Sequence, residues 1–142
     1  MKRSIRNLGE MEQFAQEILS ELPPCRHATL VALSGNLGAG KTAFVKCIAR
    51  FLGVTEEITS PTFVIEKIYK LQEQKFAHLI HIDAYRLDSG SELANLGWRE
   101  ISENPSNIIF LEWPERVAEI LPKDMKKIYF TFIDETTREV EV

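Results

Sequence analysis

The sequence lacks both an excess of positive charge and any long apolar run. Its 142 residues include 17 Lys and Arg against 21 Asp and Glu, a formal net charge of -4. Proteins that bind nucleic acid directly do so chiefly through clustered Lys and Arg, so this chain is not expected to hold RNA alone. No apolar run approaches the roughly 18 residues that span a bilayer, so no membrane association is expected.

The chain also lacks a cysteine framework and the pattern of a secretory signal. Its two cysteines, Cys25 and Cys47, form neither a metal-ligand motif nor a disulfide set. Cys47 falls within a helical apolar pattern, so we expect a buried thiol there. The charged start of the chain is followed by no apolar segment. We therefore expect a cytoplasmic protein, with residues 1–142 forming one domain.

Hydrophobic periodicity and turn signals predict an alternation of helices and strands. Helical spacing predicts helices over residues 11–22, 42–52, 89–96 (capped by Ser89 or Ser91) and 114–121. Short β-rich runs predict strands over residues 28–33, 63–71, 76–83, 107–112, 127–133 and 137–142. Two of the connections read as hairpins and others as parallel crossovers. The expected fold is an α/β domain with a mixed parallel and antiparallel sheet flanked by helices.

One glycine-rich stretch, GNLGAGKT at residues 35–42, matches the pattern G-x-x-x-x-G-K-[ST]. Its members are Gly35, Asn36, Leu37, Gly38, Ala39, Gly40, Lys41 and Thr42. Glycines let successive backbone N–H groups face phosphate oxygens, and the following helix presents its positive end. The lysine reaches the β- and γ-phosphates, and the hydroxyl is placed for Mg²⁺. The stretch predicts a P-loop that binds a nucleoside triphosphate with magnesium.

Two predicted strands end in acids, and hydrolysis requires an acid near the metal. Asp83 closes HLIHID and Glu112 closes IIFLE, and either acid fits the role of the metal-associated carboxylate. Next to Asp83, His81 reads as an ordinary strand histidine, whereas Arg86 fits either an ion pair or a phosphate contact. The segment 59–63, TSPTF, fits a phosphate-sensing switch loop and equally a polar turn braced by proline.

Taken together, GNLGAGKT, TSPTF, HIDAYRL and LEWPER resemble the TsaE family, also called YjeE. These bacterial P-loop ATPases are required to form threonylcarbamoyladenosine on tRNA. The resemblance covers residues 30–116 and implies a single P-loop NTPase domain. The glycine-rich motif departs slightly from the family pattern, because Asn36 stands where an aspartate is frequent. Ala84 likewise stands where a larger apolar residue is common.

The resemblance also implies roles for individual residues. By position, Lys41, Thr59 and Asp83 resemble the family's catalytic residues, and Thr42 and Glu112 resemble its magnesium residues. Besides residues 35–42, three residues are expected to contact ATP or ADP: Met11, Trp113 and Arg138.

The family's known setting further implies a reaction and partners. The chain is expected to hydrolyse ATP with Mg²⁺ to support or reset a complex with TsaD-like and TsaB-like subunits. It would meet tRNA only indirectly, through that complex. The alternatives are a small nucleotide or nucleoside kinase, which needs an arginine-rich lid that the chain lacks, and a nucleotide-gated binding module without useful hydrolysis. A GTP switch is disfavoured because the N-K-x-D motif is absent.

Overall fold

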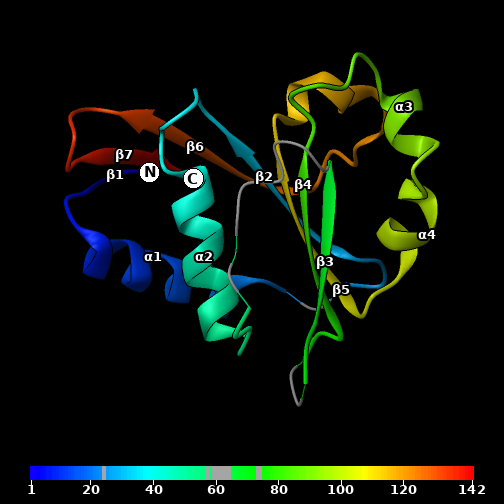
Figure 1. Ribbon diagram of the computed structural model, residues 1–142, viewed down its shortest axis with the longest axis horizontal. Helices are drawn as coiled ribbons and strands as arrows, with labels where there is room; N and C mark the ends of the chain where they lie inside the picture. Colours follow the sequence, from blue (N-terminus) through cyan, green and yellow to red (C-terminus); the bar gives the residue numbers. More distant parts are fainter. Residues whose placement is uncertain (24, 57, 59–64, 73–74) are drawn as a thin grey trace.

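The computed structural model describes residues 1–23, 25–56, 58, 65–72 and 75–142, and these form seven strands, four α-helices and one 3-10 segment (Figure 1). The strands are β1 (Lys2–Ile5), β2 (Thr29–Ser34), β3 (Glu66–Lys70), β4 (His78–Asp83), β5 (Asn107–Glu112), β6 (Lys126–Phe132) and β7 (Arg138–Glu141). The helical elements are α1 (Leu8–Glu21), α2 (Lys41–Phe51), α3 (Gly90–Ala94), α4 (Trp98–Glu103) and the 3-10 segment η1 (Pro114–Ile120).

All seven strands join one sheet in the order β1-β7-β6-β2-β5-β4-β3. The four central strands, β6, β2, β5 and β4, run parallel to one another. The outer pairs β1 with β7, β7 with β6, and β3 with β4 are antiparallel. The predicted mixed sheet is therefore confirmed. Because the central strands are parallel, the carboxyl ends of β2, β5 and β4 meet at one edge, where ligands bind in open α/β sheets.

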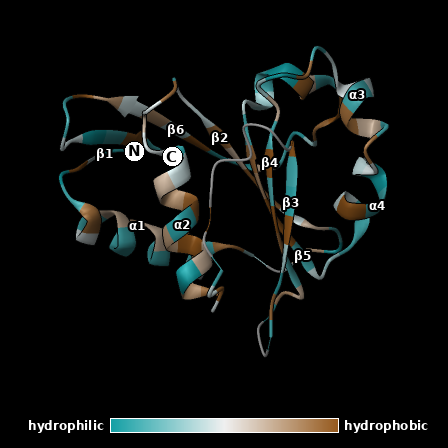
Figure 2. Cartoon of the chain, viewed as in Figure 1, coloured by the Kyte–Doolittle hydropathy of each residue, from teal (hydrophilic) through white to brown (hydrophobic). Residues whose placement is uncertain are grey.

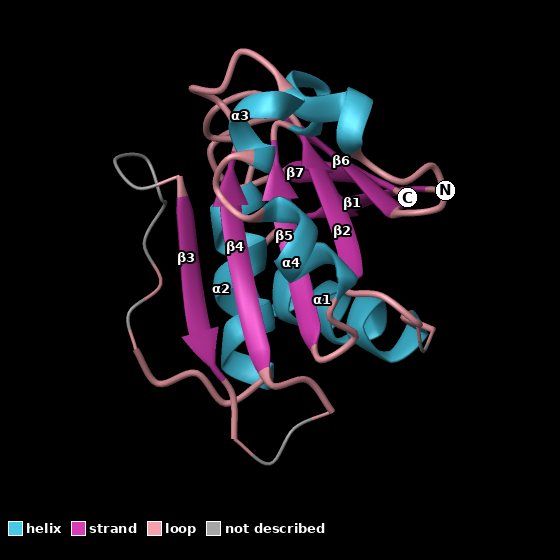
Figure 3. Cartoon of the chain, turned by 90° about the vertical axis from the view of Figure 1, so that its right-hand side faces the viewer, coloured by secondary structure: helices cyan, strands magenta, loops and turns pink. Residues whose placement is uncertain are grey.

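Helices cover both faces of this sheet, as Figures 1 and 3 show. On one face lie α1 and α2, and on the other lie α3, α4 and η1. Each face of the sheet has its own hydrophobic cluster. The central strand β5, buried from both sides, is apolar along almost its whole length and is mostly brown in Figure 2. Such continuous apolar runs are typical of parallel strands covered on both faces. Within the described part of the chain, no helix has the length and apolar character to cross a membrane.

The packing of α2 centres on Phe44, which is fully buried. Its ring contacts three other aromatic rings, those of Phe14 on α1, Phe110 on β5 and Phe130 on β6, at centroid distances of 5.5, 5.9 and 5.6 Å. Aromatic pairs of this kind contribute about 0.5–1.5 kcal/mol each beyond the area they bury. Phe44 follows Lys41 by three residues, so this packing also fixes the start of α2.

Several details differ from the sequence-based prediction. Strand β1 was not predicted, because its four residues are mostly polar and it exists through pairing with β7. Helix α4 was also not predicted, since its one buried residue, Trp98, gives no periodicity. The predicted helix over residues 114–121 is a 3-10 segment, broken at Val117 with φ −131°. The strand predicted over residues 63–71 is shorter, and residues 63 and 64 lie outside the described part.

Other expectations are confirmed. The helix predicted over residues 11–22 spans Leu8–Glu21, and Asn7 caps it by accepting a hydrogen bond from Glu10 N. The helix predicted over residues 42–52 spans Lys41–Phe51, and Gly53 follows it in the left-handed conformation with φ 83°, its N–H donating to Arg50 O. Cys47 is buried. The hairpin of β6 and β7 forms as predicted.

We predict that Phe44→Ala lowers the free energy of unfolding by about 3–5 kcal/mol, because it leaves a cavity among three rings. The matched control is Phe51→Ala on the same helix, where the side chain is 40% exposed and the expected cost is on the order of 1 kcal/mol or less. Urea unfolding of both variants measures the difference. Equal costs would show that the aromatic cluster does not anchor α2.

Candidate nucleotide site

The glycine loop joins the end of β2 to the start of α2 in a conformation that only glycine adopts easily. Gly35, Gly38 and Gly40 have φ values of 143°, 80° and 106°. At Gly35 a Cβ atom would collide with the backbone carbonyl oxygen of Phe130 on β6. The loop therefore lies against the sheet, and the first turn of α2 points its N–H groups outward. This is the backbone arrangement that binds phosphate.

A cavity of about 360 Å³ opens in front of this loop. Its lining comes from the loop, the start of α2, the ends of β4 and β5, and β7. The lining residues are Leu37, Gly38, Gly40, Lys41, Thr42, Ala43, Asp83, Tyr85, Arg86, Glu112 and Arg138. Residues distant in sequence thus share one space that contains a lysine, two arginines, two hydroxyls and two carboxylates. We call it the phosphate cavity.

A second cavity of about 360 Å³ adjoins the first and shares Gly40, Ala43 and Arg138 with it. Its other walls are the start of α1 and the turn between β6 and β7: Ile5, Arg6, Asn7, Leu8, Met11, Glu135 and Thr136. Arg138 ties the two cavities together, because its Nε donates to Gly38 O at 3.1 Å and its guanidinium donates to Asp134 O. The second cavity is apolar on the Met11 side and has room for a nucleobase. We call it the base cavity.

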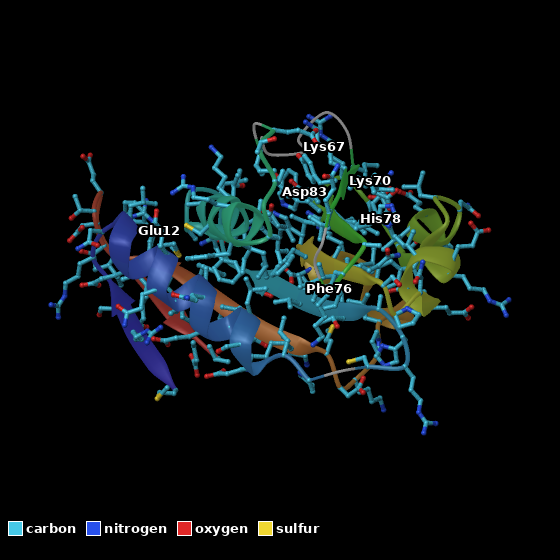
Figure 4. The ribbon with its side chains drawn as sticks, turned by 90° about the horizontal axis from the view of Figure 1, so that it is seen from below. Glu12, Lys67, Lys70, Phe76, His78 and Asp83 are labelled. Carbon is cyan, nitrogen blue, oxygen red and sulfur yellow. The ribbon has the colours of Figure 1, made fainter. Side chains whose placement is uncertain are left out.

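The two strand-end acids lie directly opposite each other. Asp83 of β4 and Glu112 of β5 are register partners in adjacent parallel strands. Burial raises the pKa of the Asp83 carboxyl, and the charge of Glu112 raises that pKa further, against the hydrogen bond from Tyr85 N. In Figure 4, Asp83 lies near Lys67 of the neighbouring strand β3. Two negatively charged carboxylates in adjacent positions repel each other, and a cation bound between them would relieve that repulsion.

Among the cations that line this cavity, Lys41 is the most deeply buried. The side chain is only 4% exposed, and its ammonium donates to Gly35 O. Burial lowers the pKa of Lys41, while the negative charges of Glu112, Asp83 and Glu115 oppose that shift. The lysine is thus placed in the phosphate cavity as a partly desolvated point charge, which strengthens its attraction to phosphate.

An aromatic and cationic stack runs from Lys41 to the surface. The Lys41 ammonium lies 4.1 Å from the centroid of the Trp113 ring, within cation–π distance. The Trp113 and Tyr85 rings are 5.1 Å apart, and the Arg116 guanidinium lies 5.6 Å from the Tyr85 ring. Trp113 has φ 60°, the one positive φ of a non-glycine residue in the described ranges. Such backbone strain of about 1–3 kcal/mol is typical of functional sites.

One of the two acids, Glu112, also contacts the buried side chain of His81. The histidine is 0% exposed, and its Nε2 lies 2.5 Å from Glu112 Oε2. The other ring nitrogen, Nδ1, is buried without a hydrogen-bond partner among the described residues. The sequence reading of His81 as an ordinary strand residue missed this contact, because β4 and β5 are far apart in sequence.

The chemistry of the phosphate cavity fits magnesium bound jointly with a nucleotide. No group of three or more His, Cys, Asp or Glu side chains in the described part of the chain could hold a metal by itself. Mg²⁺ usually takes one or two carboxylates and completes its shell with water and phosphate oxygens. The hydroxyl of Thr42 and the carboxylates of Asp83 and Glu112 line the same cavity, so the donor set suits that ion.

Comparison with known proteins agrees with this geometry. A model of the family described as Threonylcarbamoyl adenosine biosynthesis protein TsaE matches residues 5–140. The chain belongs to the TsaE family. It is 39% identical over 114 residues to the tRNA threonylcarbamoyladenosine biosynthesis protein TsaE of Treponema pallidum, covering 80% of this chain and 81% of that one.

Further relatives extend the match to nearly the whole chain. The protein of the same name in Rickettsia prowazekii is 35% identical over 136 residues, which cover 95% of this chain and 89% of the relative. Among solved structures, YdiB of Bacillus subtilis superposes with a TM-score of 0.75 and 26% identity, covering 99% of this chain and 82% of YdiB.

The structure places most of the predicted site residues around the two cavities. The phosphate cavity brings together Leu37, Gly38, Gly40, Lys41, Thr42, Asp83, Glu112 and Arg138. Met11 lines the base cavity. Gly35, Asn36 and Ala39 build the turn itself, with Ala39 N donating to Asn36 O. Trp113 contacts Lys41 from beside the cavity. Thr59, with the rest of TSPTF, lies outside the described residues.

Some residues that line the two cavities were not predicted. Asn7 and Leu8 precede the expected helix start, and Glu135 and Thr136 belong to the turn between β6 and β7. An Asn before a helical pattern is an N-cap signal, and Asp134 forms an Asx-type turn by accepting from Thr136 N at 2.9 Å. Both signals locate turns, but neither indicates that the turns face each other.

We predict that Asp83→Asn stabilises the nucleotide-free protein at neutral pH. The Asp83 pKa is raised, so the folded state holds its proton more tightly than the unfolded state, and ionisation at higher pH costs stability. That cost shrinks as the pH falls toward the ordinary Asp pKa of about 3.9, and it is absent only well below that pH, where the carboxyl is protonated in both states. Thermal unfolding from pH 4 to 8 should therefore show a gain for Asp83→Asn that grows with pH and then levels off.

The exposed Asp88 supplies the control for this test, since Asp88→Asn alters a carboxylate outside the cavity. A constant gain at all pH values, or a loss at neutral pH, would contradict the assignment of a desolvated carboxyl.

Proposed function

We propose that this TsaE-family chain is a Mg²⁺-dependent ATPase that supports or resets the complex forming threonylcarbamoyladenosine on tRNA next to the anticodon. The observation that carries the proposal is the phosphate cavity, where Lys41, Thr42 and two opposed acids meet in front of the glycine loop. A cytoplasmic location, and the working of residues 1–142 as one domain, belong to the same proposal.

Within this site each group has a distinct task. The glycine loop and Lys41 bind the β- and γ-phosphates, and Thr42 and Glu112 hold the metal, which neutralises phosphate charge when bound. Asp83 lies opposite Glu112 with a raised pKa, which suits a residue that orients the attacking water or takes up its proton. Trp113 packs on Lys41 and keeps water from that side of the ammonium.

The base cavity supports adenine as the base. Its apolar wall comes from Met11 and Leu8, and its polar rim comes from Asn7, Glu135 and Thr136. The carboxylate of Glu135 at the rim can accept a hydrogen bond from the exocyclic amino group of adenine. Guanine also carries an exocyclic amino group, so the choice of adenine rests on the absence of the guanine-reading N-K-x-D motif. ATP and ADP are therefore the proposed ligands.

The partners of the chain remain part of the proposal. TsaD-like and TsaB-like subunits are its proposed partners, since tRNA modification needs a basic surface that a chain with net charge -4 does not supply. Arg116 lies at the outer end of the stack, and a second arginine from a partner would complete the positive charge around the phosphates.

The first prediction for this function is that Lys41→Ala weakens ATP binding at least tenfold, because the phosphates lose a desolvated positive charge. Calorimetric titration with ATP, ADP and GTP, each with Mg²⁺, measures the affinities, and GTP should bind most weakly. Lys46→Ala, an exposed lysine of the same helix, is the control and should bind like the wild type. An unchanged affinity in Lys41→Ala, or equal binding of GTP, would contradict the proposed site.

The second prediction concerns turnover. The isolated chain should hydrolyse ATP slowly, and TsaD-like and TsaB-like proteins should accelerate it, because arginines supplied in trans contribute about 10³–10⁵ in rate. Asp83→Ala should keep nucleotide binding and lose the accelerated turnover. Steady-state hydrolysis and tRNA modification, each with and without the partners, are the measurements.

Three outcomes separate this function from its alternatives. Full-speed hydrolysis by the isolated chain would remove the need for partners. Normal tRNA modification with Asp83→Ala would favour the alternative of a nucleotide-gated binding module, since hydrolysis would then not be needed. Transfer of phosphate to a nucleoside instead of water would reveal a kinase.

A further inference from the structure

The pair of His81 and Glu112 has a geometry that core packing alone does not explain. His81 is fully buried, and Glu112 is 3% exposed. Removing both groups from water is costly, and buried pairs of this kind contribute little net stability compared with apolar side chains of similar volume. A buried pair next to the phosphate cavity therefore needs another explanation.

The positions of the two strands supply one. Glu112 lies directly opposite Asp83 and diagonally opposite His81, because Asp83 and His81 are two residues apart on the same face of β4. Like charges directly opposite each other repel, and the Glu112 charge indeed raises the pKa of Asp83. The hydrogen bond from His81 gives the Glu112 carboxylate a fixed partner beside this repulsive contact.

The tautomer of His81 follows from its partners. A carboxylate oxygen accepts hydrogen bonds, so His81 is protonated on Nε2. This N–H donates to Glu112 Oε2 over 2.5 Å. Nδ1 is the ring nitrogen without a partner among the described residues. The hydrogen bond engages Oε2, so Oε1 is the Glu112 oxygen without a partner on His81, and Glu112 also lines the phosphate cavity.

We propose that His81 is the positioning residue of this site: its Nε2–H fixes the Glu112 carboxylate so that one oxygen alone faces the Mg²⁺–nucleotide. The proposal rests on the proposed function, in which Glu112 serves the metal. Partners of this kind behind a metal-binding carboxylate are typically worth about 10–100-fold in metal affinity.

The test compares substitutions that keep or remove the donor. Gln places an amide N–H near the position of Nε2, whereas Leu fills a similar volume without a donor. Binding of a fluorescent, non-hydrolysable ATP analogue is titrated at increasing Mg²⁺ and, separately, in EDTA. His81→Leu should raise the Mg²⁺ concentration required by about tenfold or more, with unchanged binding in EDTA, and His81→Gln should restore most of the loss.

Two controls separate positioning from general destabilisation. Leu79→Val alters a buried side chain on the same strand and the same face, and it should leave the Mg²⁺ requirement at the wild-type value. In a Glu112→Ala background, His81→Leu should change nothing further, since its effect passes through Glu112. If His81→Leu does not fold, His81→Asn replaces it, because its shorter amide does not reach Glu112.

A measurement on the wild-type protein tests the tautomer directly and uses a variant only to assign the resonances. Nitrogen NMR of the His81 ring, identified by the resonances missing from His81→Gln, should show a protonated Nε2 protected from exchange. The proposal is overturned by an Nδ1–H tautomer, by an unchanged Mg²⁺ requirement in the donor-less variant, or by equal effects of the donor-less variant and Gln. Failure of the proposed function is a different result, namely wild-type protein that binds no nucleotide at any Mg²⁺ concentration.

Discussion

The burial of Phe44 is the packing interaction on which the geometry of the site depends. The ring lies among aromatic side chains from α1, β5 and β6, so it joins α2 to three other elements at once. Lys41 and Thr42 begin the same helix, and the glycine loop precedes them. The loop has little freedom at its other end either, because Gly35 is pressed against the backbone of Phe130. The phosphate site is therefore rigid because the hydrophobic core is rigid, and it needs no separate scaffold.

Against that rigid frame, the site itself is a region of unfavourable interactions. Asp83 and Glu112 repel each other, Lys41 is desolvated, and Trp113 adopts a strained left-handed backbone. Each of these costs stability in the free protein, and a triphosphate with its metal would relieve the charge imbalance of the acids and of the lysine together. Stability lost at a functional site and compensated elsewhere in the core is the usual compromise. Here the compensation lies in the two apolar layers on the faces of the sheet.

How far the sequence predicts such a structure depends on how local each signal is. The P-loop and the flanking strand and helix are encoded in residues 28–52, so their conformation follows from glycine positions and apolar spacing. The opposition of Asp83 and Glu112 was only partly predictable: both acids end predicted strands, but the sheet order that makes β4 and β5 neighbours is not a local property. The same reason hid the contact of His81 with Glu112. Strand β1 was missed because its four residues carry no alternation strong enough to compete with their polarity, and pairing with β7 alone makes them a strand.

The stack from Lys41 to Arg116 connects the rigid interior to the outside. Its first member lies in the phosphate cavity, its two rings are in contact, and its last member lies on the surface. A phosphate that draws the Lys41 ammonium toward itself would weaken the cation–π contact with Trp113, whose ring also packs against Tyr85 and the hydrophobic cluster on that face of the sheet. Tyr85 and Arg116 are both exposed, so the outer end of the stack is open to a protein partner. Four side chains in contact thus connect the phosphate cavity to a surface that a partner protein can reach.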